Sequence, residues 1–448
     1  MPLEMENTMN HSSLPGRPVY IVDGTRTPFL KARGAPGPFT ASDLAVAAGR
    51  PLLLRQPFPP EALDEVILGC VYSGPDEANI ARVVALRLGC GEATPAWTVQ
   101  RNCASGMQAV DSAAKDIAGG RAGLVLAGGT ESMSHHPVLL NEQMVAWLAA
   151  WNRAHGLGKR ARQLARLRPP MLQPIIGLLR GLTDPVVGLT MGQTAEQLAW
   201  RFHISREAMD AFAMRSHHRL ADAQAEGRLD EIEPLFDTHG TPFEQDDGVR
   251  PDSDMTSLAR LRPVFDKPTG KVTAGNSAQV TDGAAWLLLA SEEMVMRHDL
   301  PVMGRLKDSA WAALDPAEMG LGPVHAMAPL MKRHRLESGD IDHWEINEAF
   351  AAQVLACLHA WQDADYVREA LGLDAPFDPI DEDRLNVDGG AIALGHPVGA
   401  SGARIILHLL HTLQHHKARR GIASLCVGGG QGGAVLVEHN PDAEGGSQ

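Results

Sequence analysis

The sequence predicts an α/β protein built from two similar halves, and three observations support this fold class. Strand-like apolar runs alternate with helical patterns near both ends of the chain. A similar unit occurs twice, once before about residue 134 and once in about the last hundred residues. Between the two units, over about residues 134–262, the alternation fails and long helical patterns replace it. Such a repeat implies two halves packed together rather than one extended sheet.

The first unit contains the apolar runs Val19–Val22, Val66–Val71 and Leu124–Ala127, each bounded by turn or loop residues. A helical pattern from Met107 to Ile117 precedes the third run and ends at Gly119-Gly120. Strands and helices therefore alternate along this part of the chain.

The second unit repeats this order. Ala104-Ser105-Gly106 is matched by Ala400-Ser401-Gly402, and both triplets open a helical pattern that is followed by a strand-like run. In the second unit, these are a helix from Arg404 to His416 and a strand from Ile422 to Val427. Chance likeness is the alternative, because three small residues alone are a weak match.

The intervening region contains the helical patterns Thr194–Phe202 and Ser205–Ala223, with Ser205 as an expected N-cap. Within it, residues 147–180 interleave basic with apolar residues in an otherwise acidic protein. We consider four interpretations of this stretch: contact with an anionic membrane surface, contact with a partner protein, binding of the phosphates of a nucleotide-bearing ligand, or a helical cap whose charges face water.

Length and composition limit the class of protein. The 448 residues suggest two or three packed units, at about 100–200 residues per domain. Hydrophobic residues make up 44% and charged residues 21%, so a disordered or fibrous protein is not favoured. The formal net charge of −14 argues against nucleic-acid binding, which needs a basic surface. No apolar stretch is long enough to suggest a membrane-spanning helix.

We expect residues 1–16 to form a disordered tail without a targeting signal. The N-terminal half is expected at residues 17–295, with the insertion at about 134–262, followed by the C-terminal half at 296–440 and a second tail at 441–448. The five cysteines are far apart and form no Cys-x-x-Cys pair, which favours a reducing cytoplasm and no zinc site.

Cys103 is the first candidate for chemistry. It stands at a predicted strand-to-helix junction, where free backbone N–H groups and the positive end of the helix dipole favour the nucleophilic thiolate. The small residues Ala104, Ser105 and Gly106 would let a bulky thioester approach. From position alone, the alternative is a small buried hydrophobic residue.

Two glycine-rich clusters occur near the end of the chain. The first contains His396, which can deprotonate a cysteine and donate to a developing oxyanion. In the second, Cys426 precedes the loop Gly428–Gly433 and is a candidate acid/base beside free N–H donors. A tight turn or a phosphate cradle is the alternative for this loop, although no Lys-Ser/Thr follows to make a Walker motif.

Asn347 lies where an apolar strand-like run meets a helical pattern. Its carboxamide can hold a water or a carbonyl in place. Its alternative role is to cap the helix.

Four motifs together resemble the thiolase family, in the family's order: Asn-Cys-Ala-Ser-Gly at 102–106, Asn-Glu-Ala-Phe-Ala at 347–351, Gly-His-Pro-x-Gly-x-Ser-Gly at 395–402, and Cys-x-Gly-Gly-Gly-x-Gly at 426–432. Further likenesses extend the resemblance over about residues 17–438. The resemblance implies the thiolase fold, in which two βαβαβαββ halves form five αβαβα layers and a helical loop domain is inserted in the first half.

The resemblance also implies residue roles. Cys103 would carry the acyl group, His396 would activate it, and Cys426 would be the second acid/base. Asn347 would hold a water that completes one oxyanion hole with His396, and the N–H groups of Cys103 and Gly428 would form the other. Substrate or CoA contacts are implied for Met191, Ser277, Ala349 and Phe350. Coenzyme A would be a substrate, with no bound cofactor or metal.

Several departures from simple acetoacetyl-CoA thiolases resemble the thiolase subunit of fatty-acid oxidation trifunctional complexes. They are Thr190 before Met191-Gly192, the order Asn276-Ser277-Ala278, the basic insertion at 147–180 and the segment from Asp363 to Asn386. That branch often has histidine where this chain has Asn347. We therefore favour a degradative 3-ketoacyl-CoA thiolase of fatty-acid β-oxidation, and acetoacetyl-CoA specificity stays open.

Two other functions are alternatives. A condensing enzyme of the ketoacyl synthase type would not need the second reactive cysteine, Cys426. A noncatalytic thiolase-like binding protein would be expected to lose Cys103 or His396. As partners, we expect acyl-CoA and CoA, further copies of the chain in a dimer or tetramer, a hydratase/dehydrogenase subunit, and a peripheral membrane contact through 147–180.

Overall fold

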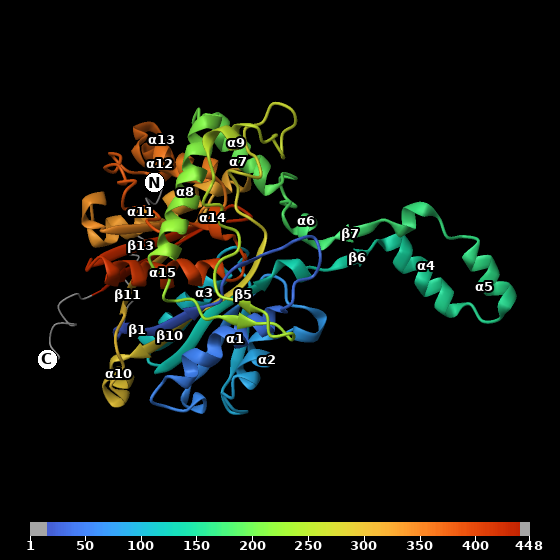
Figure 1. Ribbon diagram of the computed structural model, residues 1–448, viewed down its shortest axis with the longest axis horizontal. Helices are drawn as coiled ribbons and strands as arrows, with labels where there is room; N and C mark the ends of the chain where they lie inside the picture. Colours follow the sequence, from blue (N-terminus) through green and yellow to red (C-terminus); the bar gives the residue numbers. More distant parts are fainter. Residues whose placement is uncertain (1–15, 440–448) are drawn as a thin grey trace, which may run out of the picture.

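The computed structural model describes residues 16–439, so the predicted tails at 1–16 and 441–448 lie outside the described residues apart from Gly16. Within this range no helix is long and apolar enough to cross a membrane. Figure 1 shows a layered body from which one long arm projects.

The first half alternates strands with helices as the sequence predicts. Its elements before the insertion are β1 (Val19–Arg26), β2 (Leu30–Lys31), α1 (Ala41–Leu54), β3 (Glu65–Gly69), α2 (Ile80–Arg87), β4 (Ala96–Val99), α3 (Ser105–Ala118) and β5 (Leu124–Ser132). After the insertion, β10 (Thr281–Ser291) and α10 (Glu292–His298) complete this half. β10 is buried along its whole length, which explains why it shows no period-two alternation of apolar and polar residues.

The second half repeats the order. Its elements are β11 (Gly304–Ala313), α11 (Gly322–His334), β12 (His343–Ile346), α12 (Ala351–Gln362), α13 (Ala364–Leu371), α14 (Ala391–Leu394), α15 (Ser401–His415), β13 (Arg420–Val427) and β14 (Gln431–Glu438). The two Ala-Ser-Gly triplets open α3 and α15, so the repeat seen in the sequence corresponds to a structural repeat.

Strand order shows the same repeat. The first half runs β4-β3-β5-β10-β1, and the second runs β12-β13-β14-β11. In both halves the parallel pair, β3 with β5 or β12 with β13, is followed by an antiparallel neighbour. The equivalent of β4 in the second half is reduced to one parallel bridge between Trp344 and Leu385.

The two half-sheets are not separate, which corrects one expectation. β1 pairs with β11 at two positions, Tyr20 with Arg305 and Ile21 with Gly304, so hydrogen bonding continues from one half-sheet into the other. On its opposite edge, β1 pairs with β10 over nearly its full length.

Helices α3 and α15 form the central layer between the half-sheets, whereas α1 and α2 cover one outer face and α11 and α12 the other (Figure 1). The central helices approach closely at their first turns. A Cβ on Gly106 would lie 2.8 Å from the carbonyl oxygen of Gly399, and one on Gly402 would lie 2.6 Å from the amide of Met107. Only glycine permits this approach.

The insertion contains β6 (Val138–Leu140), α4 (Glu142–Arg153), α5 (Leu157–Leu164), β7 (Pro174–Ile176), α6 (Gly177–Gly181), α7 (Met191–Arg201), α8 (Arg206–Ala225), β8 (Leu235–Phe236), β9 (Pro242–Phe243) and α9 (Met255–Ala259). The Ser205 side chain caps α8 by accepting from the amide of Ala208, as expected. α7 and α8 pack on the second half through α12, whereas α4 and α5 pack on each other in the projecting arm (Figure 1).

Buried charges fasten the insertion to the first strand. The Arg26 guanidinium donates to Asp246 through both terminal nitrogens, at 2.7 and 2.9 Å, and its Nε donates to Glu231 at 3.0 Å. The same Glu231 carboxylate faces His408 of α15 at 3.1 Å. Burial disfavours the charged ring, but Glu231 and Asp388 raise the pKa of His408 to about 10. Insertion, first strand and central helix therefore share one ionic network.

We predict that Arg26→Ala lowers the free energy of unfolding by about 3–5 kcal/mol, because it leaves the buried Asp246 carboxylate without its cation and removes one of the two cations beside Glu231. Denaturant unfolding followed by fluorescence would measure this change. The matched control is Arg33→Ala, since Arg33 pairs with Asp247 at the surface and its side chain is 70% exposed. The control should change stability by less than about 1 kcal/mol, and an equal loss in both variants would contradict a special role for the buried network.

Candidate active site

Cys103 lies between β4 and α3, on a turn that requires an unusual backbone. Asn102 adopts a left-handed conformation with φ 43°, which asparagine tolerates better than most residues. The amide of Ser105 then donates to the carbonyl of Asn102 and starts the helix. The Cys103 side chain is half-buried and lines a cleft of about 700 Å³. It is therefore reachable by a ligand in that cleft.

Two backbone N–H groups, of Gly428 and of Cys103 itself, donate toward the Cys103 sulfur. The Asn102 side chain donates to the carbonyl of Gly428 at 2.7 Å and holds the two loops together. Burial nevertheless raises the pKa of the Cys103 thiol, although both N–H groups oppose that rise. The backbone N–H groups favour the thiolate as the sequence predicts, but desolvation of the sulfur, which depends on the packed fold, outweighs them.

His396 lies in the loop before α15, after Gly395, whose φ of 107° disfavours any other residue. Its Nδ1 is 2.7 Å from the hydroxyl of Ser401, which fixes the ring. Burial, together with a smaller contribution from the Arg404 charge, lowers the pKa of His396 to about 4, so the ring is neutral at pH 7. Its buried Nε2 has no hydrogen-bond partner within residues 16–439. A neutral ring bonded through Nδ1 leaves Nε2 as the nitrogen that can exchange a proton with a ligand.

Asn347 is buried at the end of β12, three residues before the N-cap Phe350 of α12. It therefore does not cap that helix, and the capping alternative is wrong. Its Nδ2 lies 3.5 Å from Nδ1 of His396, and its backbone amide donates to Ser424 of β13 at 2.9 Å. Among the described residues, its Oδ1 has no hydrogen-bond partner. An unsatisfied buried oxygen costs free energy, which a bound water or ligand would recover.

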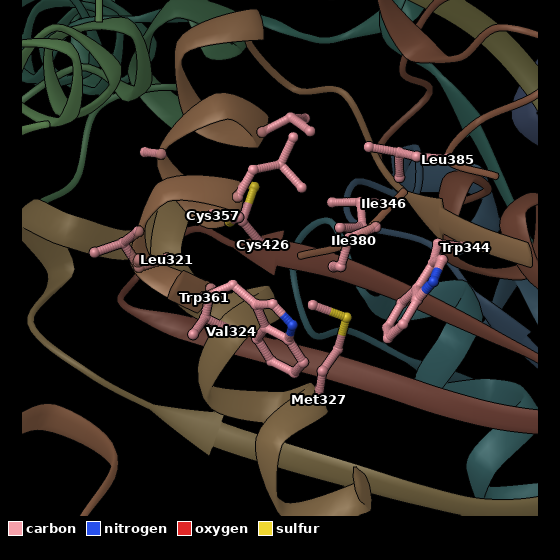
Figure 2. Close-up of a cluster of buried hydrophobic side chains, with 14 of the residues drawn as sticks. Leu321, Val324, Met327, Trp344, Ile346, Cys357, Trp361, Ile380, Leu385 and Cys426 are labelled. Carbon is pink, nitrogen blue, oxygen red and sulfur yellow. The ribbon is translucent and has the colours of Figure 1, made fainter. Parts of the chain in front are cut away.

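Cys426 is at the end of β13, only 1% exposed. Figure 2 shows it beside Cys357 in the hydrophobic cluster that also contains Ile346 and Trp361. Burial raises the pKa of the Cys426 thiol well above its ordinary value, and the neighbouring sulfurs of Cys103 and Cys357 raise it further. Cys426 is thus a protonated thiol at neutral pH, suited to donate a proton.

The four sequence motifs converge on one region. The third motif meets the first through the close contact of Gly399 with Gly106, and the fourth meets the first through the N–H of Gly428. The second motif meets the third through the contact of Asn347 with His396, and it meets strand β13, which leads into the fourth motif, through Ser424. Cys103 and Gly428 line the cleft, whereas His396, Asn347 and Cys426 lie buried.

The predicted substrate contacts divide into two groups. Met191 lines the cleft with Cys103. The cleft is not lined by Ser277, Ala349 or Phe350. These residues pair with one another's chain segments: Ser277 forms a β-bridge with Phe350, and the amide of Ala278 donates to the carbonyl of Ala349. The Ser277 hydroxyl is used internally, since it donates to the carbonyl of Thr273 at 2.7 Å. For these three residues, contact with CoA stays a prediction.

Glu131 was not predicted from the sequence. Its carboxylate is buried at the end of β5 and accepts from the amides of Val71 (2.9 Å), Tyr72 (3.1 Å) and Gly399 (3.1 Å). It also lies 3.2 Å from Nε2 of His136, which lines the cleft with Val71. One side chain thereby holds loops from both halves around Cys103. An acidic residue two positions after the glycine pair Gly128-Gly129, at the carboxyl end of a strand, was the available sequence signal.

We predict that Glu131→Gln makes Cys103 more reactive toward iodoacetamide at a given pH. The Glu131 charge raises the pKa of Cys103, so its removal should lower that pKa and increase the thiolate fraction. The alkylation rate at pH 8 should therefore rise. Mass spectrometry of the modified Cys103 peptide across a pH series would measure it.

The matched control is Asp282→Asn, which removes another buried carboxylate from the neighbouring strand β10. Asp282 accepts from the amide of Ser134 at 2.8 Å and is not among the charges that act on Cys103. The pH dependence of alkylation should therefore stay unchanged in this control. An unchanged dependence in Glu131→Gln as well would exclude the electrostatic effect.

Comparison with known proteins relates this geometry to a family. Residues 19–293 match the family described as "Thiolase, N-terminal domain", and residues 300–439 match "Thiolase, C-terminal domain". The chain is 36% identical to the 3-ketoacyl-CoA thiolase of Aeromonas salmonicida over 439 residues, which cover 97% of this chain and 100% of that one. It is also 36% identical to the 3-ketoacyl-CoA thiolase of Yersinia pestis, covering 94% and 97% of the two chains.

Solved structures give the same result. Human mitochondrial 3-ketoacyl-CoA thiolase in complex with CoA superimposes with a TM-score of 0.82 at 36% identity, covering 96% of this chain and 100% of that one. The acetyl-CoA acetyltransferase of Bacillus anthracis has a TM-score of 0.81 at 35% identity, covering 95% and 100%. The predicted fold class is confirmed, and the chain belongs to the thiolase family.

Proposed function

We propose that this protein is a 3-ketoacyl-CoA thiolase, an acyltransferase that uses free CoA to cleave 3-ketoacyl-CoA into acetyl-CoA and a shortened acyl-CoA. One observation carries the proposal: Cys103 lines a cleft, with a second thiol and a neutral histidine in the converging motifs around it. Two thiols and one unprotonated imidazole can form and resolve an acyl-cysteine. The names of the similar chains from Aeromonas and Yersinia support the same reaction.

In the first half-reaction, His396 accepts the proton of the Cys103 thiol and the sulfur attacks the 3-keto carbon. The bond between C2 and C3 breaks, acetyl-CoA leaves as its enolate, and Cys426 protonates the enolate carbon. The raised pKa of Cys103 explains why a base is needed at this step. Burial keeps the thiol of Cys426 protonated until the enolate forms.

In the second half-reaction, CoA enters and Cys426, now a thiolate, takes its thiol proton. The CoA sulfur attacks the acyl-cysteine, acyl-CoA departs, and His396 returns its proton to Cys103. Turnover is therefore ping-pong, and all protons balance over the cycle.

Two groups of donors stabilise the oxyanions in this scheme. The N–H groups of Cys103 and Gly428 serve one carbonyl oxygen, and His396 with a water held by Asn347 serves the other. The unsatisfied Nε2 of His396 and Oδ1 of Asn347 support the second assignment. The thioester itself activates the carbonyl and the α-proton, so the scheme uses CoA as a substrate and needs no other cofactor.

The proposal extends to setting and assembly. We propose a cytoplasmic enzyme of fatty-acid β-oxidation that forms a homo-oligomer and associates with a hydratase/dehydrogenase subunit. The likeness of its insertion to that of trifunctional-complex thiolases supports the partner. Light scattering and co-purification would test the two assemblies separately.

Acetoacetyl-CoA thiolysis is the second candidate, because the Bacillus anthracis acetyl-CoA acetyltransferase is nearly as similar in structure. A series of 3-ketoacyl-CoA substrates distinguishes the two. For a 3-ketoacyl-CoA thiolase, kcat/KM should rise by about ten-fold or more from four carbons to medium chains, as added methylenes are buried. A maximum at acetoacetyl-CoA would favour the second candidate.

We predict that Cys103→Ala lowers thiolysis of 3-ketoacyl-CoA by about a thousand-fold or more, because no acyl-enzyme can form. Loss of 3-ketoacyl-CoA absorbance in the presence of CoA and Mg²⁺ would report the rate. Cys90→Ala is the control, since Cys90 is buried in the outer hydrophobic cluster around α1 and α2. Full turnover by Cys103→Ala would disprove the assignment of the nucleophile.

A further inference from the structure

The carboxylate of Glu131 holds the ring of His136 on one wall of the active-site cleft. Its Oε1 accepts from the amide of Tyr72 at 3.1 Å and lies 3.2 Å from Nε2 of His136. Its Oε2 accepts from the amides of Val71 at 2.9 Å and Gly399 at 3.1 Å. These four contacts use the acceptor positions of an ionised carboxylate, so a protonated Glu131 would lack an acceptor for its own hydrogen. Nε2 of His136 is therefore the donor in their contact.

The other ring nitrogen of His136, Nδ1, has no hydrogen-bond partner within residues 16–439. A neutral imidazole that donates through Nε2 presents Nδ1 as an acceptor. The His136 side chain is 11% exposed, and it lines the cleft together with Cys103. A ligand in the cleft can thus reach an unused hydrogen-bond acceptor.

The position of this acceptor is fixed by contacts on two sides of the ring. The Tyr72 ring packs against His136 at 5.4 Å between centroids, with 43° between the planes. Tyr72 is itself held, since its amide donates to the same Glu131 oxygen that faces Nε2 of His136. Because the ring is held at one nitrogen and at one face, Nδ1 is in place before a substrate arrives.

Apolar side chains line the same cleft as His136. They include Val71, Met133 and Val398, and the last two are 5% and 8% exposed. Such side chains accept the methylenes of an acyl chain, but they offer no hydrogen-bond donor to Nδ1. An unmatched polar atom in apolar surroundings costs free energy, which a donor on the substrate would recover.

We propose that His136 selects 3-ketoacyl-CoA substrates whose acyl chain carries a hydroxyl group, which donates to Nδ1 while the chain occupies the cleft of Cys103. The inference rests on the proposed function, because the acyl chain enters the cleft as a thioester and stays there as an acyl-cysteine. A hydroxyl is favoured over a carboxylate, since Nδ1 offers a lone pair and Glu131 carries a negative charge behind the ring. A plain alkyl chain would leave Nδ1 without a partner.

Matched substrates test the inference on the full chain. Values of kcat/KM at pH 8 are compared for 3-ketoacyl-CoA chains of six, eight and ten carbons, each with and without a terminal hydroxyl. At one or more of these lengths, the wild type should prefer the hydroxylated chain by about ten-fold, because one hydrogen bond satisfies an otherwise unpaired atom. His136→Leu removes the acceptor and should abolish the preference. His136→Gln keeps an acceptor oxygen and should give an intermediate preference. The ratio within one variant cancels any general loss of activity.

The matched control is His135→Leu, because the exposed His135 bonds to the hydroxyl of Ser132 at 2.8 Å and is not among the described residues that line the cleft. Its preference should equal that of the wild type.

The inference is overturned if the wild type shows no hydroxyl preference at any length, or if the preference survives in His136→Leu. A stronger preference for chains with a terminal carboxylate, measured as a third series, would also overturn it. Thiolysis without a hydroxyl preference contradicts this inference alone. Absence of thiolysis with every chain, acetoacetyl-CoA included, contradicts the proposed function as well.

Discussion

The close contact between the first turns of α3 and α15 is the constraint on which the catalytic arrangement depends. Each of these helices follows a loop that carries a chemically competent residue, Cys103 in one half and His396 in the other. Glycines at 106, 399 and 402 let the two backbones approach closer than any side chain would permit. The duplicated architecture thus supplies two helix starts, and their packing brings the two preceding loops together into one site.

The resting site is held without charge on its reacting groups. Burial disfavours both thiolates and the imidazolium, so Cys103, Cys426 and His396 are all neutral at pH 7. Charge would develop only when a substrate carbonyl is available to share it with the N–H donors. The Glu131 charge also disfavours the Cys103 thiolate, and its carboxylate holds the loops that line the cleft. The same desolvation that makes the thiol a poor nucleophile at rest makes electrostatic stabilisation of an oxyanion effective.

The projecting arm, residues 138–181, differs from the body in the burial of its apolar side chains and in the pairing of its charges. In the body, even charged residues such as Arg26 and Glu231 are buried and paired, which binds the base of the insertion to the sheet. In the arm, apolar side chains are exposed and basic side chains are unpaired among the described residues. Both arrangements belong to one insertion, which also supplies residues that line the cleft of Cys103.

The sequence alone determined the α/β class, the repeat and the four motifs, because strand periodicity, glycine positions and motif order are local properties of the chain. It located α8 and its cap at Ser205 for the same reason. It could not determine the ionisation of Cys103, since desolvation depends on what the fold packs around the sulfur. Nor could it identify Glu131, whose partners at Val71 and Gly399 are distant in the chain, or exclude capping by Asn347. The order of residues determines which chemical groups are present and how they are spaced along the chain. Their proximity and burial are determined only when the two halves pack together.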